Sequence, residues 1–124
     1  MTLCVGIDHV EIRRVAKAMR NPRFLPRFFG EQERAQLQKR GNPPASVAAN
    51  FCAKEALGKA LGCGLGGFEL RDVQLLRHKS GRPYLALTGK AAELAQRNGL
   101  SFEVSVSHDK IYALAQVVGY SVDS

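Results

Sequence analysis

One stretch of the chain combines charged side chains with a nearly continuous run of small and apolar residues. This stretch is residues 45–61, and its charged residues are Lys54, Glu55 and Lys59. A helix with so little polar surface is usually buried, and charges there are costly unless they are paired or coordinate a ligand. Glu55 and Lys59 lie one helical turn apart, so an i,i+4 ion pair is the structural alternative. We favour a site, because the small neighbours leave room for a ligand.

A second carboxylate, Asp8, ends an apolar segment at residues 3–8 that is predicted to be a strand. One role for Asp8 is to cap a helix that starts near Val10. The other role is to join Glu55 and a lysine around a divalent cation, with water and phosphate as further ligands, as is usual for Mg²⁺. The glycines after the long helix, Gly64 among them, would let the backbone approach a bound group, although no P-loop pattern occurs.

The net charge is concentrated in one segment. Residues 13–40 hold nine Lys and Arg residues against Glu31 and Glu33, which equals the formal charge of +7 for the whole chain. Such a segment steers anionic partners, and nucleic acid, an acidic protein and a phosphorylated cofactor all fit it. A solvated helical surface is the structural alternative. A nucleic-acid-binding module is the alternative function, although no helix-turn-helix, RNP or KH pattern occurs.

The histidines give weaker signals. Ser107, His108 and Asp109 are contiguous, and neighbouring residues of a strand point to opposite faces, so they do not form a hydrolase triad. His108 is predicted to contact a phosphate or sugar, or to be a solvated turn residue. His9 and His78 lack metal-ligand spacing and are predicted to be structural or exposed.

Cysteine usage and hydropathy indicate the compartment. The chain has three Cys residues, without a CxxC pair or a Cys/His cluster, which favours the reducing cytoplasm and argues against a zinc site. No apolar run approaches the ~18 residues that a membrane span needs. The N-terminus lacks the basic and long apolar regions of a secretory signal.

The predicted elements mix helices and strands without regular βαβ alternation. They are a strand at 3–8, helices at about 10–20, 23–29, 31–40 and 44–61, a hairpin of 73–77 with 83–87, a helix at 90–97, and a hairpin of 102–107 with 111–118. This order predicts an α+β fold with an antiparallel sheet packed against the long buried helix. A length of 124 residues predicts one domain, residues 1–124.

Four motifs occur in a characteristic order. They are GIDHVEIRRV at 6–15, FCAKEALGKALGCG at 51–64, GRPY at 81–84, and SVSH at 105–108 followed by YALAQVV at 112–118. Together they resemble the holo-acyl-carrier-protein synthase family, the short 4′-phosphopantetheinyl transferases. The resemblance extends over nearly the whole chain, and the motif at 51–64 is the most specific.

The resemblance implies the fold of that family and a transfer reaction. Phosphopantetheine would pass from coenzyme A to a serine of an apo acyl carrier protein, leaving adenosine 3′,5′-bisphosphate. Asp8 and Glu55 would be Mg²⁺ ligands, Lys59 would meet the pyrophosphate, and these three would be the catalytic residues. The expected coenzyme A contacts are Lys54, Lys59, Gly64, Gly81, Arg82, Pro83 and His108. The expected carrier contacts are Arg13, Arg14, Lys17 and Arg20.

The resemblance also implies a homotrimer with active sites between subunits. The motifs leave open whether the carrier serves fatty-acid or polyketide synthesis, and which group accepts the serine proton. Four positions depart from the family pattern: His9 replaces Ile, Gly30 replaces a capping Thr, Asn50 replaces a basic residue, and Cys63 replaces Ser or Thr. Asn50 and Cys63 therefore predict altered phosphate contacts.

Overall fold

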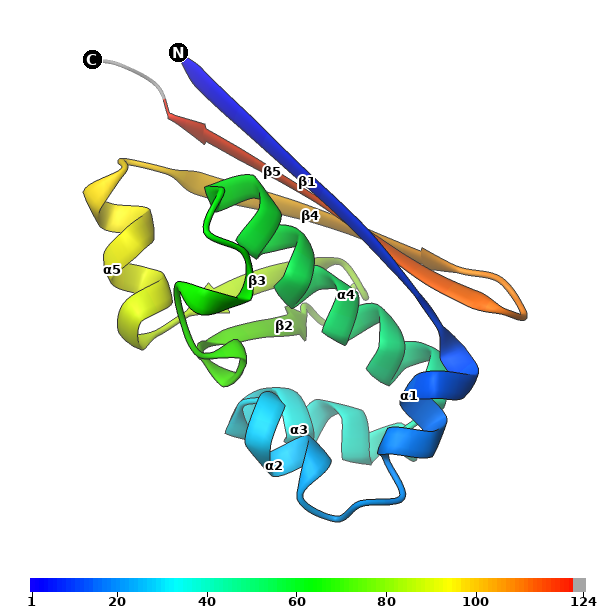
Figure 1. The fold of residues 1–124 in the computed structure, drawn as a ribbon. Helices are drawn as coiled ribbons and strands as arrows, with labels where there is room; N and C mark the ends of the chain where they lie inside the picture. Colours follow the sequence, from blue (N-terminus) through cyan, green and yellow to red (C-terminus); the bar gives the residue numbers. More distant parts are fainter. Residues whose placement is uncertain (122–124) are drawn as a thin grey trace.

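The structure, a computed structural model, describes residues 1–121, with the backbone alone at residue 65. Its main sheet is antiparallel and has the order β1 (Thr2–Glu11), β5 (Tyr112–Ser121), β4 (Ser101–His108). The long helix α4 (Pro44–Leu61) lies across one face of this sheet (Figure 1). The predicted α+β fold, an antiparallel sheet on a long buried helix, is confirmed.

The other elements surround α4. They are α1 (Ile12–Ala18), α2 (Phe24–Phe28), α3 (Glu31–Lys39), 3-10 turns at Gly64–Gly66 and Leu70–Asp72, the hairpin β2 (Val73–Arg77) and β3 (Pro83–Leu87), and α5 (Gly89–Arg97). Contacts between β3 and β4 place the hairpin beside one edge of the main sheet, opposite β1 (Figure 1). Among the described residues, no helix is long and apolar enough to span a membrane.

The first strand is longer than predicted. It continues to Glu11, and Asp8 pairs with Ala115 in mid-strand. The expectation that residues 3–8 form the strand and that a helix starts near Val10 was therefore wrong, as was a helix-capping role for Asp8. The physical reason is the partner strand: β5 begins at Tyr112, which pairs with Glu11, so the backbone of β1 keeps its hydrogen bonds up to that residue.

The two predicted hairpins are present. The β2–β3 hairpin has the predicted bounds. In the second hairpin β4 is one residue longer than predicted at each end, whereas β5 begins one residue later and ends three residues later. The turn of this second hairpin is closed by Asp109, whose Oδ1 accepts hydrogen bonds from the backbone N–H of Ile111 at 2.8 Å and of Tyr112 at 2.7 Å. An aspartate that binds the backbone two and three residues ahead is a common turn device.

Gly6 lets β1 lie directly on α4. A Cβ atom at this position would come within 1.8 Å of the Ala56 carbonyl oxygen and 2.7 Å of the Ala60 nitrogen. Since α4 presents small buried residues here, including Ala56 and Ala60, strand and helix meet backbone to backbone. This close approach brings Asp8, the next inward-facing residue of β1, against the middle of α4.

A buried polar network joins α3, α4 and β2. Glu33 Oε1 accepts from Lys54 Nζ at 2.6 Å, and Oε2 accepts from Asn50 Nδ2 at 3.1 Å and from the Leu75 N–H at 3.2 Å. The side chains of Glu33 and Lys54 are fully buried. The carboxylate thus neutralises the buried ammonium of Lys54 and ties three elements together.

Gln74 supplies the helix cap that Gly30 lacks. Its Oε1 accepts from the Glu33 N–H at 2.9 Å, at the start of α3. A Cβ atom at Gly30 would lie 2.3 Å from Gln74 Cδ, so the glycine makes room for this side chain. A strand residue therefore takes over the role of a capping hydroxyl.

Candidate active site

The inward face of β1 presents Asp8 to α4. Strand alternation turns Ile7 and His9 to the opposite face, where His9 packs edge-on against the ring of Tyr112 at a centroid distance of 5.7 Å. The Asp8 side chain is 12% exposed. The departure from the family pattern at His9 thus points away from the carboxylate.

Lys59 and Glu55 reach Asp8 from the facing side of α4. Lys59 Nζ lies 3.1 Å from Asp8 Oδ1 and donates to the Ile7 carbonyl at 3.0 Å. Glu55 lies close enough to Asp8 for the two carboxyl groups to interact. Among the described residues, Asp8 is the carboxylate that pairs with Lys59, so the i,i+4 pair with Glu55 is not formed. The structure brings the three predicted residues together.

The carboxylates repel each other in a partly buried place. Burial, then the hydrogen bond and charge of Asp8, raise the pKa of Glu55 to about 7, and Lys59 opposes this shift. Cys52 lies alongside and donates to the Ala113 carbonyl at 3.6 Å. Burial and the two carboxylates raise the pKa of its thiol to about 12, so the thiol stays protonated.

These carboxylates suit a hard divalent cation. They offer only oxygen ligands, and a cation between them would remove their repulsion. Within residues 1–121 no group of three or more His, Cys, Asp or Glu side chains is arranged to hold a metal. Two carboxylates, with other positions left to water and phosphate, match the habit of Mg²⁺ rather than that of Ca²⁺ or zinc.

Lys54 is not part of this cluster, and the expectation that it contacts coenzyme A disagrees with its position. Its ammonium is fully buried and donates to Glu33 and to the carbonyls of Leu70 and Val73, which uses all three of its protons. Burial lowers the pKa of Lys54, and Glu33 opposes this. Its role here is structural.

A groove at the β4 edge is lined by other residues that were predicted to contact coenzyme A. It has a volume of about 350 Å³, and its lining includes Pro83, His108, Arg40 and Arg77. Gly81 is adjacent, since its carbonyl accepts from Arg77 Nη1 at 2.9 Å. Arg40 and Arg77 were not predicted from the sequence to contact a ligand.

Two other predicted contacts lie elsewhere. Arg82 is exposed and its Nη2 pairs with Glu103 at 3.2 Å. The carbonyl of Gly64 packs against α4, where a Cβ atom on Gly58 would come within 2.7 Å of it. Gly64 therefore lies beside the helix segment that carries Lys59, and Arg82 lies on the hairpin surface.

The predicted carrier contacts lie on α1 and just after it. Arg13, Arg14, Lys17 and Arg20 are all exposed. Arg14 and Lys17 also line a surface pocket of about 550 Å³ together with Arg23 and Arg27 of the next segment. The rings of Phe24 and Phe28 complete this pocket, so its surface combines four cations with aromatic side chains.

Comparison with known proteins identifies the family. Residues 4–115 match the model of the 4′-phosphopantetheinyl transferase superfamily. The chain belongs to this family. It is 43% identical to the holo-[acyl-carrier-protein] synthase of Treponema denticola over 120 residues, which are 95% of this chain and 98% of that protein. The resemblance drawn from the motifs is thereby confirmed, and with it the class of enzyme, a phosphopantetheinyl transferase.

Solved structures of the family agree with the fold. A Chronobacterium ammoniagenes ACPS-CoA complex matches with a TM-score of 0.86 and 26% identity, over 99% of this chain and all of that chain. The Helicobacter pylori holo-[acyl-carrier-protein] synthase in complex with coenzyme A matches with a TM-score of 0.82 and 30% identity, over 94% of this chain and 99% of that one.

Proposed function

We propose that this phosphopantetheinyl transferase moves the 4′-phosphopantetheine group from coenzyme A to a serine of an apo acyl carrier protein, in a Mg²⁺-dependent reaction that leaves adenosine 3′,5′-bisphosphate. The observation that carries the proposal is the meeting of Asp8, Glu55 and Lys59 at one point between β1 and α4. Relatives named for this activity, and a relative solved with coenzyme A, support the substrates.

The residues divide the chemistry between them. Asp8 and Glu55 would hold Mg²⁺. When bound, this cation would neutralise the negative charge of the pyrophosphate. Lys59 extends from this point with its side chain 56% exposed, so its ammonium can meet the phosphate that leaves with adenosine. Phosphoryl transfer asks a protein mainly for position and charge, and this cluster offers both.

The basic surface around α1 fits the second substrate. Arg14, Lys17, Arg23 and Arg27 surround one pocket, and within the described chain no carboxylate lies within 4.0 Å of their charged nitrogens. We propose that Arg13 and Arg20 extend this surface and that it docks an acidic face of the carrier. Charge complementarity of this kind speeds association and makes it sensitive to salt.

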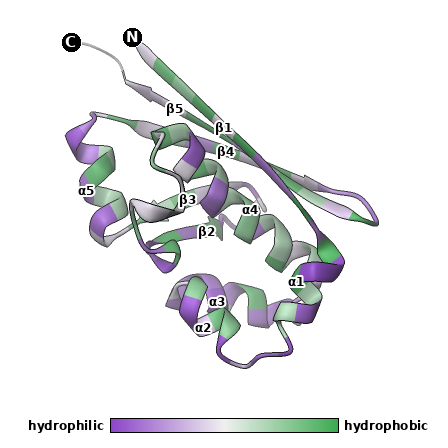
Figure 2. Ribbon diagram, viewed as in Figure 1, coloured by the Kyte–Doolittle hydropathy of each residue, from purple (hydrophilic) through white to green (hydrophobic). Residues whose placement is uncertain are grey.

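We also propose the homotrimer with shared sites. The outer face of the main sheet carries exposed Leu3, Val5 and Ile7, which are 61%, 56% and 52% exposed, and no described helix covers it (Figures 1 and 2). An apolar face of this kind marks an association surface. The carboxylate cluster and the β4-edge groove flank α4 on opposite sides, so one coenzyme A can use the cluster of one subunit and the groove of a neighbour.

A single domain over residues 1–124 is the simplest unit for this function, since the elements share one core around α4. The cytoplasm remains the proposed location, and the thiols of Cys4, Cys52 and Cys63 are all free.

The test is incubation with coenzyme A, Mg²⁺ and an apo acyl carrier protein, followed by the intact mass of the carrier. A phosphopantetheine increment that disappears with EDTA and returns with added Mg²⁺ is the expected result. A carrier of unchanged mass at every Mg²⁺ concentration would refute the proposal.

A further inference from the structure

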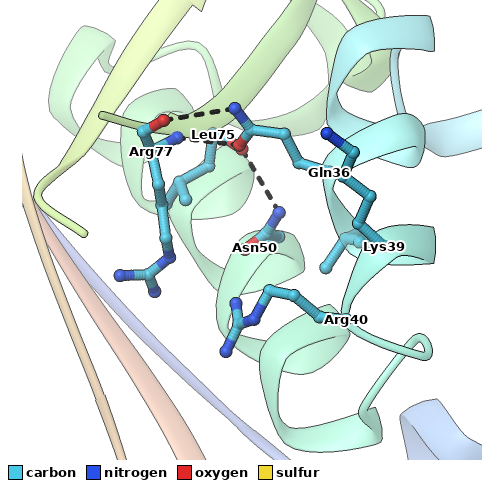
Figure 3. Close-up of a pocket in the computed structure, with 7 residues that line it drawn as sticks. Gln36, Lys39, Arg40, Asn50, Leu75 and Arg77 are labelled. Atoms are coloured by element: carbon cyan, nitrogen blue, oxygen red, sulfur yellow. Dashed lines mark hydrogen bonds between the residues drawn. The ribbon is translucent and has the colours of Figure 1, made fainter. Parts of the chain in front are cut away.

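Arg77 enters the pocket beside Asn50, the position where the motif lacks its basic residue. Asn50 is buried, and its Nδ2 is already bonded to Glu33 and, at 3.4 Å, to the Leu75 carbonyl. It therefore supplies no charge to the pocket. Figure 3 shows Arg77 on the adjoining strand and Arg40 at the end of α3 on either side of it.

The backbone at Arg77 is held firmly. Its N–H donates to Gln36 Oε1 at 2.8 Å, and its carbonyl accepts from Gln36 Nε2 at 3.2 Å (Figure 3). The guanidinium donates one hydrogen bond, from Nη1 to the Gly81 carbonyl. The two backbone bonds hold the strand at residue 77, and the bond to Gly81 restrains the guanidinium, which favours a preorganised contact with a ligand.

The two arginines share a site without a counter-charge. Arg40 and Arg77 line both the pocket of Figure 3 and the β4-edge groove. Burial, and then the charge of Arg40, lower the pKa of Arg77. Across residues 1–121, neither guanidinium lies within 4.0 Å of a carboxylate. Two close, unpaired guanidiniums are a site for a multiply charged anion.

The other polar residues that line the β4-edge groove also suit an anion. Its polar lining consists of hydroxyl groups and an imidazole, with no Asp or Glu: Ser46, Ser105, Ser107 and His108. Hydroxyls and guanidiniums are the groups that phosphate oxygens accept bonds from. The hydrogen-bond donors that line the groove therefore suit a phosphate ester.

We infer that Arg77, acting with Arg40, binds the 3′-phosphate of coenzyme A and provides the basic group that position 50 lacks. This inference rests on the proposed function for the identity of the substrate. The 3′-phosphate is a monoester with close to two negative charges, which two guanidiniums match. The pyrophosphate, by contrast, is the reacting group and belongs at the carboxylate cluster with Lys59.

The test compares coenzyme A with dephospho-coenzyme A, which lacks only the 3′-phosphate. Arg77→Ala should raise KM for coenzyme A about 10- to 100-fold, the usual size of a lost bond to a charged group, and leave KM for dephospho-coenzyme A unchanged. Arg77→Lys should recover only part, because an ammonium cannot make the forked contact. Arg97→Ala, an exposed arginine at the end of α5, is the matched control.

A second measurement is independent of transfer. Calorimetry should show that the wild type binds adenosine 3′,5′-bisphosphate more tightly than AMP, and that Arg77→Ala abolishes the difference. Equal losses for both nucleotides, or no loss, would overturn the inference. Failure of the wild type to modify the carrier would refute the proposed function instead, and the two results are therefore distinguishable. Folding is checked by thermal melting, since the Gln36 contacts use only the backbone of residue 77.

Discussion

Two carboxylates and a lysine, separated by almost fifty positions of sequence, meet at one point. Asp8 comes from the inward face of β1, and Glu55 and Lys59 come from one side of α4. Their shared environment is partly buried, so each charge is felt strongly by the others. The chemistry proposed here depends on the charge of both acids.

Glu55→Gln and Asp8→Asn should each reduce carrier modification by about 10²-fold or more, because each removes an anionic oxygen at unchanged size. Thermal melting should show that the fold survives, since the mutual repulsion of the acids is relieved. Glu93→Gln, at an exposed position of α5, is the control. Activity near the wild-type level in either site variant would exclude a shared cation.

Cys52 and Cys63 should differ sharply in reactivity. At pH 8 a thiol with a pKa of about 12 is ionised in about one molecule in 10⁴, and Cys52 is also fully buried. Cys63 is exposed. Brief treatment with iodoacetamide followed by peptide mass analysis should therefore label Cys63 and spare Cys52. Labelling of Cys52 in the folded protein would mean that β1 and α4 separate readily.

At the scale of elements, the contact of β1 with α4 sets the geometry of the cluster. Gly6→Ala should destabilise the protein by about 1–3 kcal/mol, the usual cost of overpacking, because its Cβ would collide with the Ala56 carbonyl. The same displacement should lower transfer activity. Gly66→Ala is the matched control, since a Cβ there meets nothing within 4 Å. Denaturant unfolding of both variants checks the difference.

For the buried pair of Lys54 and Glu33 we expect a substitution to lower stability and to leave the binding of coenzyme A nearly unchanged. Lys54→Met should cost about 3–5 kcal/mol, because it leaves the carboxylate of Glu33 buried without a counter-charge. Burial already raises the pKa of Glu33, and loss of the lysine raises it further. The folded variant binds a proton more readily than the unfolded chain, so its stability should fall as the pH rises.

KM for coenzyme A of the folded Lys54→Met protein should stay within about 2-fold of the wild type at low temperature. A large increase in KM with unchanged stability would restore Lys54 as a substrate contact.

At the scale of the whole molecule, we propose different partners for the uncovered sheet face and the basic surface. Val5→Asp should convert the assembly into monomers, because a charge in the middle of an apolar interface is costly. Light scattering coupled to size exclusion gives the mass, and circular dichroism checks the fold. A trimer that persists in Val5→Asp would place the subunit contact elsewhere.

Mixed assemblies test whether sites are shared. Glu55→Gln and His108→Ala subunits should each be impaired alone and should regain part of the activity when they are unfolded and refolded together, since some sites then receive both intact halves. Lack of recovery in verified mixed assemblies would mean that each subunit completes its own site.

Much of this arrangement was predictable from the sequence. Glu55 and Lys59, on an otherwise apolar helix, and Asp8, at the end of an apolar segment, predicted which side chains meet. The burial of Lys54 was not predictable, because its partner, Glu33, lies on another helix and only tertiary packing reveals the pair. The role proposed for Arg77 could not be predicted for the same reason: it depends on Arg40 and Asn50, which neighbour Arg77 in space and not in the chain.

The alternation of β1 has a consequence for any change in chain length. Even-numbered positions, Gly6 and Asp8, turn to the helix, and odd-numbered positions, Val5 and Ile7, turn outward. Deleting one residue between Asp8 and the end of this strand would turn Gly6 and Asp8 outward if the rest of the chain kept its position. Val5 and Ile7 would then turn to the helix in place of Gly6 and Asp8, so the acid would leave the cluster and the outer face would lose its apolar side chains in one step.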